Sequence, residues 1–197
     1  MEKRNPIILI HGLWNTSSIF SSITTKLDDI GIEYFAPTLN HSFGMTSIVD
    51  LTNILDKLIL EKYGWEKELD ILGFSMGGII GRCWLQKFNG YKRTRRLISV
   101  GSPHRGTLLA QLVPDYPFRG ISEMKINSKF LRELAKKDSF LDHIECISFF
   151  TYWDLMVFPG WWTNLNSGEK ISLKVFKHRN LVRNNFSVNK IIEKIKM

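Results

Sequence analysis

Cysteine is scarce in this sequence of 197 residues, and its scarcity excludes several kinds of protein. Only Cys83 and Cys146 are present, and their spacing matches neither a disulfide framework nor a metal-binding motif, so we expect two free, buried thiols. Long apolar runs are also missing, because none approaches the ~20 residues that a membrane-spanning helix needs. The apolar run at residues 7–10 is too short for the core of a signal peptide. These absences predict a cytoplasmic protein.

Acidic residues are fewer than basic ones, with 19 Asp and Glu against 27 Lys and Arg and a net charge of +8. Residues 91–96 hold part of the excess, and residues 169–197 contain eight Lys or Arg and two Glu. Such a surface attracts nucleic acid or anionic lipid, or it is simply a solvated face. No nucleic-acid motif accompanies the charge, so we expect no nucleic-acid partner. Peripheral contact with an anionic membrane surface is the expected interaction, and the oligomeric state stays open.

Short apolar runs alternate with amphipathic stretches along most of the chain. This alternation predicts an α/β fold in which a mostly parallel sheet of about six strands is covered by helices on both faces. We expect a single domain over residues 1–197, with residues 104–143 as a small partial lid. The expected strands are residues 6–12, 32–37, 69–74, 96–103, 144–153 and 170–176, and the expected helices are residues 16–31, 47–64, 77–88, 106–112, 128–137 and 187–196.

One Ser stands between glycines where the third expected strand meets the helix that follows it. Ser75 lies in the sequence LGFSMGG, so that Gly73 and Gly77 flank it two residues away on either side. A turn this tight presents its central side chain above the sheet. Ligands of parallel sheets bind at the carboxyl ends of the strands, where this Ser would lie. The pattern therefore predicts a nucleophile, and the alternative is a Ser that merely caps the helix.

The same edge of the sheet predicts an acid and a base for Ser75. Asp154 directly follows the fifth expected strand, and His178 follows the sixth. A base must reach the Ser hydroxyl to remove its proton, and a carboxylate orients the imidazole that does so. Asp142, near the start of the fifth strand, is the alternative acid. Two other histidines at this edge precede the acid, and we expect them to brace loops: His11 and His104.

Several motifs spread over nearly the whole chain resemble one family. The segments PIILIHGLW, LGFSMGG, GSPHRGT and DLMVFP are similar to those of small bacterial lipases and esterases of the α/β-hydrolase superfamily. The resemblance implies that Ser75 is the nucleophile, Asp154 the acid and His178 the base. It also implies an oxyanion hole made by the backbone amides of Leu13 and Met76.

The function that the resemblance implies is a serine hydrolase that cleaves carboxylic esters, with lipid-like acyl groups, through an acyl-enzyme. Such an enzyme needs no metal and no organic cofactor. A thioesterase or an acyltransferase with the same triad is an alternative. A non-catalytic binding protein with this fold is another alternative, because a fold does not determine a function.

Aromatic residues cluster near the expected acid and near the expected oxyanion hole. Bulky apolar rings at strand ends favour a pocket for an acyl or aryl group, and packing roles in the core or in loops are the alternative. The residues expected to bind substrate are Trp14, Trp153, Phe158 and Trp161.

Overall fold

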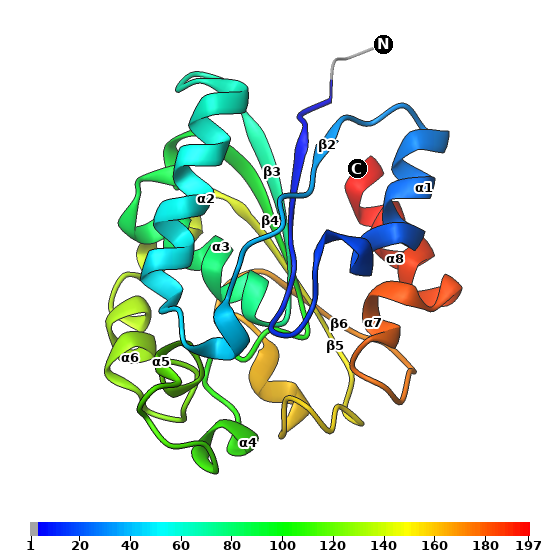
Figure 1. Cartoon of the computed structure of the whole chain (residues 1–197). Coiled ribbons are helices and arrows are strands. Elements are labelled where there is room, and N and C mark those ends of the chain that lie inside the picture. Colours follow the sequence, from blue (N-terminus) through cyan, green and yellow to red (C-terminus); the bar gives the residue numbers. More distant parts are fainter. Residues whose placement is uncertain (1–3) are drawn as a thin grey trace.

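The computed structural model describes residues 4–197, and its centre is one sheet of six strands (Figure 1). The strands are arranged in the order β2-β1-β3-β4-β5-β6, and every neighbouring pair is parallel. The predicted parallel sheet is therefore confirmed, although its second strand is shorter than expected. The strands are β1 (Ile7–Ile10), β2 (Tyr34–Phe35), β3 (Leu69–Phe74), β4 (Thr94–Val100), β5 (Glu145–Phe150) and β6 (Glu169–Ser172).

Helices cover both faces of the sheet, as the alternating pattern predicts (Figure 1). Helices α2 (Ile48–Tyr63), α3 (Met76–Lys87) and α6 (Lys129–Ala135) pack on one face, and α1 (Ser21–Asp29), α7 (Asn180–Arg183) and α8 (Asn185–Lys196) pack on the other. No helix within residues 4–197 is both long enough and apolar enough to span a membrane. The remaining helical segments are α4 (Leu108–Gln111), α5 (Arg119–Ser122) and the short 3-10 helices η1 (Ser17–Phe20), η2 (Ser42–Gly44), η3 (Gly90–Arg93), η4 (Asp138–His143) and η5 (Gly160–Thr163).

Strand β3 shows why these segments form a central sheet. All six of its residues are buried, as expected for a parallel strand that is covered on both faces. Its side chains alternate between the two layers, since Ile71 packs with α2 and α3 while Leu72 packs with α1 and α8. The one charged residue of the strand, Asp70, forms an ion pair with Arg95 at 2.8 Å, which compensates the burial of its carboxylate.

The two cysteines are free and buried, which confirms the expectation from their spacing. Cys83 lies in α3 and Cys146 in β5, on the same side of the sheet. Burial raises the pKa of the Cys83 thiol to about 11 and that of Cys146 to about 12, because a thiolate is poorly solvated in the core. Neither thiol is therefore a nucleophile near neutral pH.

The first turn of α3 lies unusually close to the end of β1. A Cβ atom on Gly77 would lie 1.9 Å from the carbonyl oxygen of Ile10, which is far inside van der Waals contact. Because the opposing atom belongs to the backbone, it cannot move aside as a flexible side chain would. Glycine at this position therefore determines how closely the helix after β3 approaches the neighbouring strand.

We expect Gly77→Ala to destabilise the fold by at least about 3 kcal/mol, because α3 must move away from β1 to accommodate the methyl group. Urea unfolding monitored by circular dichroism measures this change. Gly81→Ala is the control in the same helix, since its nearest neighbour is a side-chain methyl of Ile71 at 3.0 Å and Ala favours the helix. Equal unfolding midpoints for the two variants would contradict the prediction.

Candidate active site

Ser75 occupies a strained turn between β3 and α3. Its backbone has φ 56° and ψ −128°, a conformation that residues other than glycine rarely adopt. The turn is anchored by the Ser75 amide, which donates a hydrogen bond of 2.9 Å to the carbonyl of Val100 in β4. The side chain thus stands at the carboxyl edge of the sheet, at the start of a helix, as the glycine pattern predicts.

Asp154 and His178 are brought together from two loops that follow β5 and β6. The Nδ1–H of His178 donates a hydrogen bond of 2.6 Å to Oδ2 of Asp154, whose side chain is only 1% exposed. The other carboxylate oxygen accepts hydrogen bonds from the amides of Met156 and Val157, at 2.9 and 3.0 Å. Both oxygens of the carboxylate are therefore satisfied, and its orientation toward the imidazole is determined by the backbone of its own loop.

The second nitrogen of His178 is left free by this arrangement. Its Nε2 is buried and has no hydrogen-bond partner among residues 4–197. The ring packs against Phe74, with ring centroids 4.7 Å apart and planes tilted by 31°. Ser75 and His178 line the same cavity. An imidazole placed beside a Ser hydroxyl can remove its proton.

The amides of Leu13 and Met76 flank Ser75, and their role as oxyanion-hole donors stays a prediction. Met76 is the first residue of α3, where amides have no partner within the helix. Leu13 lies in the loop after β1 and lines the cavity beside Ser75. Gly12 allows this loop to come close, because a Cβ atom there would lie 2.6 Å from that of Ser75. Neither amide donates to a backbone acceptor within the described chain.

Two histidines hold the loop that carries Leu13. His11 donates from Nδ1 to the carbonyl of Gly12 at 2.9 Å and accepts from the amide of Leu39 at 2.9 Å, so it braces the loop as expected. His41 accepts a hydrogen bond of 3.0 Å from the amide of Trp14, a supporting role that sequence analysis missed. Burial lowers the pKa of both imidazoles, which keeps them neutral and able to accept these bonds. His41 follows the second strand and therefore lies at the carboxyl edge of the sheet, and this position could have indicated its supporting role.

His104 is also a structural residue. It is buried, and its Nε2 lies 2.7 Å from the hydroxyl of Ser99 in β4. Burial lowers its pKa well below the usual value, with a smaller contribution in the same direction from Arg82. Within residues 4–197, no group of three His, Cys, Asp or Glu side chains is placed to hold a metal ion.

The cavity beside Ser75 and His178 is mostly aliphatic. Its volume is about 430 Å³, which is within the range of small-molecule sites, and no Asp or Glu lines it. Seven of its sixteen lining residues come from the chain between β4 and β5, which includes the expected partial lid at residues 104–143. Whether this segment moves as a lid stays a prediction. The apolar lining residues are Leu13, Trp14, Pro103, Leu109, Ala110, Val113, Ile121, Met124, Met156 and Val157.

Only one of the four expected aromatic residues, Trp14, lines this cavity. The structure places the other three outside its lining, because their rings pack elsewhere or face solvent. Trp153 packs near Phe176, with ring centroids 6.1 Å apart, and Trp161 lies near the ring of Tyr152 at 6.2 Å. The side chain of Phe158 is half-exposed, and its backbone pairs with the start of α4.

The aliphatic residues that line the cavity instead were missed, although the chain contained a signal for them. Leu109, Ala110 and Val113 follow β4, and the strand-end rule places them at the correct edge. Their spacing also fits one face of a short helix, and the adjacent Leu108 and Leu112 are exposed.

Comparisons with known proteins bear on the family and the fold. A model of the palmitoyl protein thioesterase family matches residues 6–159, a range that includes Ser75 and Asp154 and ends before His178. A comparison with curated protein sequences finds no match.

Solved structures resemble the fold over almost the whole chain. The mature form of Bacillus licheniformis lipase BlEst2 aligns with a TM-score of 0.77 and 14% identity, over 99% of this chain and 93% of that one. Aspergillus fumigatus lipase B aligns with a TM-score of 0.77 and 14% identity, over 98% of this chain and 53% of the lipase. An extracellular α/β-hydrolase from a Paenibacillus species gives a TM-score of 0.65 and 16% identity, over 98% and 97%. At such identities the likeness shows a shared fold.

We expect Asp154→Asn to lower turnover by roughly ten-thousand-fold with little loss of stability, because an amide keeps the turn but favours the wrong imidazole tautomer. Steady-state hydrolysis of a soluble ester measures the loss. Asp142→Asn is the control, since that carboxylate accepts a hydrogen bond from Ser167 and has no contact with His178. A larger loss of turnover in Asp142→Asn than in Asp154→Asn would contradict the assignment of Asp154 as the acid.

Proposed function

The chain belongs to the palmitoyl protein thioesterase family of α/β-hydrolases, and from this premise we propose that it is a serine hydrolase of acyl esters and thioesters. In this proposal Ser75 is the nucleophile, His178 the general base and Asp154 the residue that orients the imidazole. The observation that carries the proposal is the apolar cavity that Ser75 and His178 line together. Such a wall accommodates a hydrocarbon acyl chain and offers no counter-charge to a cationic substrate.

The reaction divides into two steps with the same base. Nε2 of His178 takes the hydroxyl proton of Ser75 as its oxygen attacks the acyl carbonyl carbon. The carbonyl becomes an oxyanion, which the amides of Leu13 and Met76 stabilise. The leaving alcohol or thiol receives the proton from the imidazolium, and Ser75 is left acylated. Water then attacks the acyl-enzyme, and its proton is taken by the same imidazole. The bond between the acyl carbon and Ser75 Oγ breaks, the imidazolium returns the proton to Ser75, and the carboxylic acid leaves.

A long acyl chain fits the cavity better than an acetyl group. Each methylene that moves from water into an apolar site contributes about 0.8 kcal/mol. The aliphatic side chains of Ile121 and Met124 supply such surface, and both are nearly fully buried. We therefore expect kcat/KM to rise with acyl length from acetyl toward medium and long chains.

The leaving group distinguishes two forms of this proposal. The resemblance in sequence favours carboxylic esters, whereas the family model is that of palmitoyl protein thioesterases and favours a thioester. Both give the same acyl-enzyme, and an acceptor alcohol in place of water would make the reaction an acyl transfer. Comparing an octanoyl ester with an octanoyl thioester under identical conditions distinguishes ester hydrolysis from thioester hydrolysis. Product analysis with added glycerol reveals acyl transfer.

We expect Ser75→Ala to abolish labelling by a fluorophosphonate probe and to lower turnover on the order of a million-fold, because the triad acts as a unit. In-gel fluorescence and ester hydrolysis measure the two effects. Ser102→Ala is the control, since that hydroxyl is buried behind the nucleophile turn and does not line the cavity. Labelling of Ser75→Ala at the wild-type rate would refute the assignment.

We expect Val113→Phe to change the preference for acyl length, because the larger ring fills part of the cavity. Losing room for about two methylenes corresponds to about a tenfold fall in kcat/KM for a decanoyl ester, with a butyryl ester little affected. The measurement is a series of p-nitrophenyl esters from acetyl to decanoyl. Leu112→Phe is the control, because the adjacent Leu112 is exposed and outside the cavity. An unchanged length profile in Val113→Phe would place the acyl chain elsewhere.

A further inference from the structure

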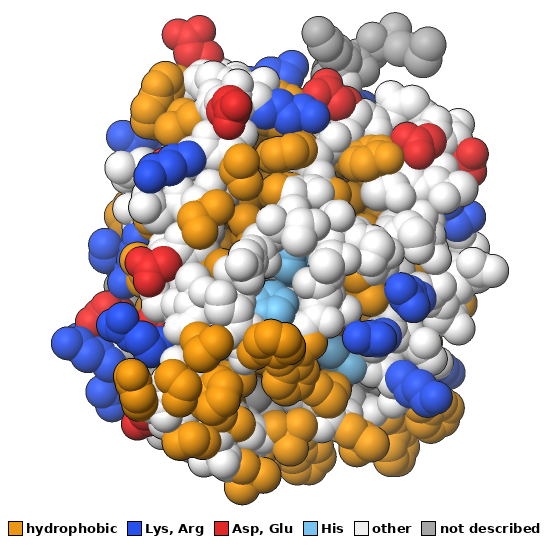
Figure 2. Space-filling model, in the orientation of Figure 1, with side chains coloured by type: hydrophobic (Ala, Val, Ile, Leu, Met, Phe, Trp, Pro, Cys, Tyr) orange, Lys and Arg blue, Asp and Glu red, His pale blue; other side chains and the backbone are white. Residues whose placement is uncertain are grey.

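Large apolar side chains are exposed mainly at one end of the molecule. Figure 2 shows them gathered along the lower edge, where the chain leaves the carboxyl ends of the strands. We call four of them the apolar rim: Leu112 and Tyr116 after β4, Leu155 after β5, and Phe176 after β6. Their exposed fractions are 81%, 86%, 77% and 71%.

The apolar rim borders the entrance of the cavity on three loops. Leu112 precedes Val113, which lines the cavity, and Leu155 precedes the lining residue Met156. Phe176 directly precedes Lys177, which also lines it. Exposed apolar surface and buried cavity wall are thus neighbours along the chain in each loop. A ligand that rests on the rim is already at the entrance.

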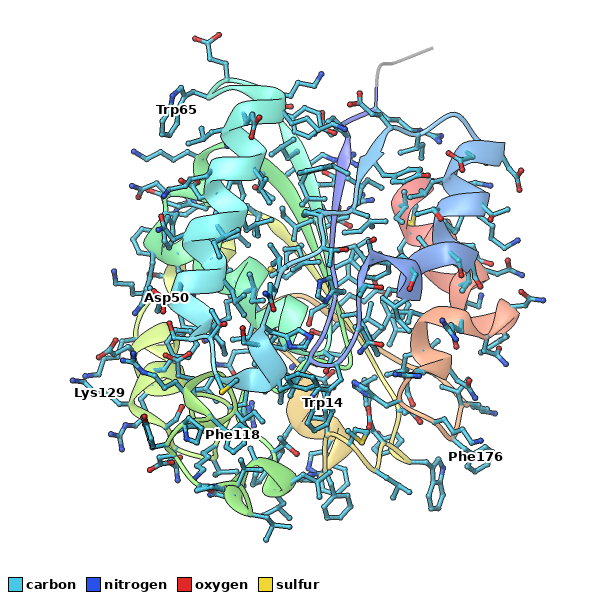
Figure 3. The ribbon with its side chains drawn as sticks, viewed as in Figure 1. Trp14, Asp50, Trp65, Phe118, Lys129 and Phe176 are labelled. Atoms are coloured by element: carbon cyan, nitrogen blue, oxygen red, sulfur yellow. The ribbon has the colours of Figure 1, made fainter. Side chains whose placement is uncertain are left out.

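Among residues 4–197, no such cluster is exposed at the opposite end of the molecule. Trp65 lies at this opposite end, and its exposed fraction is 73%. Figure 3 shows it at the upper end of the molecule, far from Trp14 and Phe176 at the lower end. Single exposed apolar residues are ordinary on soluble proteins, whereas a contiguous patch marks an interaction surface. The asymmetry indicates that the carboxyl edge contacts an apolar partner.

The charges around the apolar rim indicate what kind of partner this is. Residues 173–187 contain Lys174, Lys177, Arg179 and Arg183 and no Asp or Glu. Both arginines line a second hollow of about 400 Å³, which shares Trp14, Asn15 and Arg179 with the first cavity. Cations beside exposed apolar side chains suit the boundary between anionic headgroups and acyl chains.

Carboxylates do little to offset this positive charge. In residues 151–168 the one acidic residue is Asp154, which is buried against His178. In the loop after β4, Asp115 is exposed but pairs with Lys125 at 2.6 Å. A second copy of this chain, placed rim to rim, would bring the same arginines of residues 173–187 close together, so the charges disfavour self-association at this edge.

We propose that the carboxyl edge of the sheet docks onto an anionic lipid bilayer. The apolar rim enters the boundary between headgroups and acyl chains, and the cations of residues 173–187 contact lipid phosphates. The entrance of the cavity then faces the membrane, so that an acyl chain passes from the bilayer to Ser75 without crossing water. The docking does not depend on catalysis, whereas the delivery of substrate rests on the proposed hydrolase function.

Co-sedimentation with vesicles of equal parts phosphatidylglycerol and phosphatidylcholine tests the docking. Binding is measured in the Ser75→Ala background, so that lipid is not consumed. We expect Leu112→Ser, Leu155→Ser and Phe176→Ser together to weaken binding at least about tenfold. The control is Trp65→Ser with Ile54→Ser, which removes exposed apolar surface away from this edge and should leave binding unchanged.

The charged part of the surface is tested separately. Lys174→Gln with Arg183→Gln should weaken binding to the anionic vesicles several-fold and leave the weaker binding to pure phosphatidylcholine unchanged. Lys57→Gln with Lys62→Gln on α2 is the charge-matched control. Wild-type binding should also weaken as salt is raised. Equal effects of the two charge variants would contradict the proposed role of residues 173–187.

Turnover of a soluble butyryl ester by the active protein separates docking from catalysis. The triple rim variant should keep wild-type kcat/KM on this substrate while losing activity on vesicle-borne acyl esters. If vesicles bind but no ester is hydrolysed, the docking stands and the proposed function fails. Absence of vesicle binding, or equal binding by the rim and control variants, would overturn the docking.

Sedimentation velocity distinguishes a membrane from a second copy of the chain. A wild-type dimer that the triple rim variant converts to a monomer, without vesicle binding, would assign the rim to self-association and overturn the proposal. Leu112→Asp is a second variant in case the triple change lowers the yield, and it should weaken vesicle binding in the same direction.

Discussion

The close packing of α3 against β1 is the contact on which the site depends. Gly77 lets the first turn of the helix approach the carbonyl of Ile10, and Gly12 lets the next loop pass over Ser75. Between these two contacts Ser75 is held at a positive φ, with its side chain above the sheet. The same approach brings the loop that carries Leu13 and the start of α3 close to Ser75. A wider separation of helix and strand would disperse all of these groups at once.

The order and type of the elements, and the residues at strand ends, could be predicted because they depend on short-range rules. Buried parallel strands are continuous apolar runs, and glycines around a lone Ser indicate a tight turn. Asp154 and His178 were found because the carboxyl ends of neighbouring strands meet at one edge. The structure joins these two by a hydrogen bond and places Ser75 on the same cavity. The catalytic roles of the three residues stay predictions.

The cavity wall could not be predicted in the same way, because it depends on how an irregular segment folds back over the sheet. Trp153, Phe158 and Trp161 lie in the correct loop, but their backbone directions turn the rings away from the cavity. His41 was missed for a related reason, since its place at the same edge of the sheet does not reveal its bond to the amide of Trp14, which joins two loops. The sequence shows that apolar residues follow the strand ends and therefore gather at this edge. Only the path of the chain decides which of them face Ser75.

The loop after β4 links the chemistry of the site to its surroundings. In α4 and the residues directly after it, Leu109 and Val113 line the cavity while Leu112 is exposed and outside its lining. The loop after β5 repeats this division, since Asp154 is buried against His178 and the next residue, Leu155, is exposed. Burying the outer side chains in lipid would therefore restrain the backbone segments that form the cavity wall and orient the imidazole.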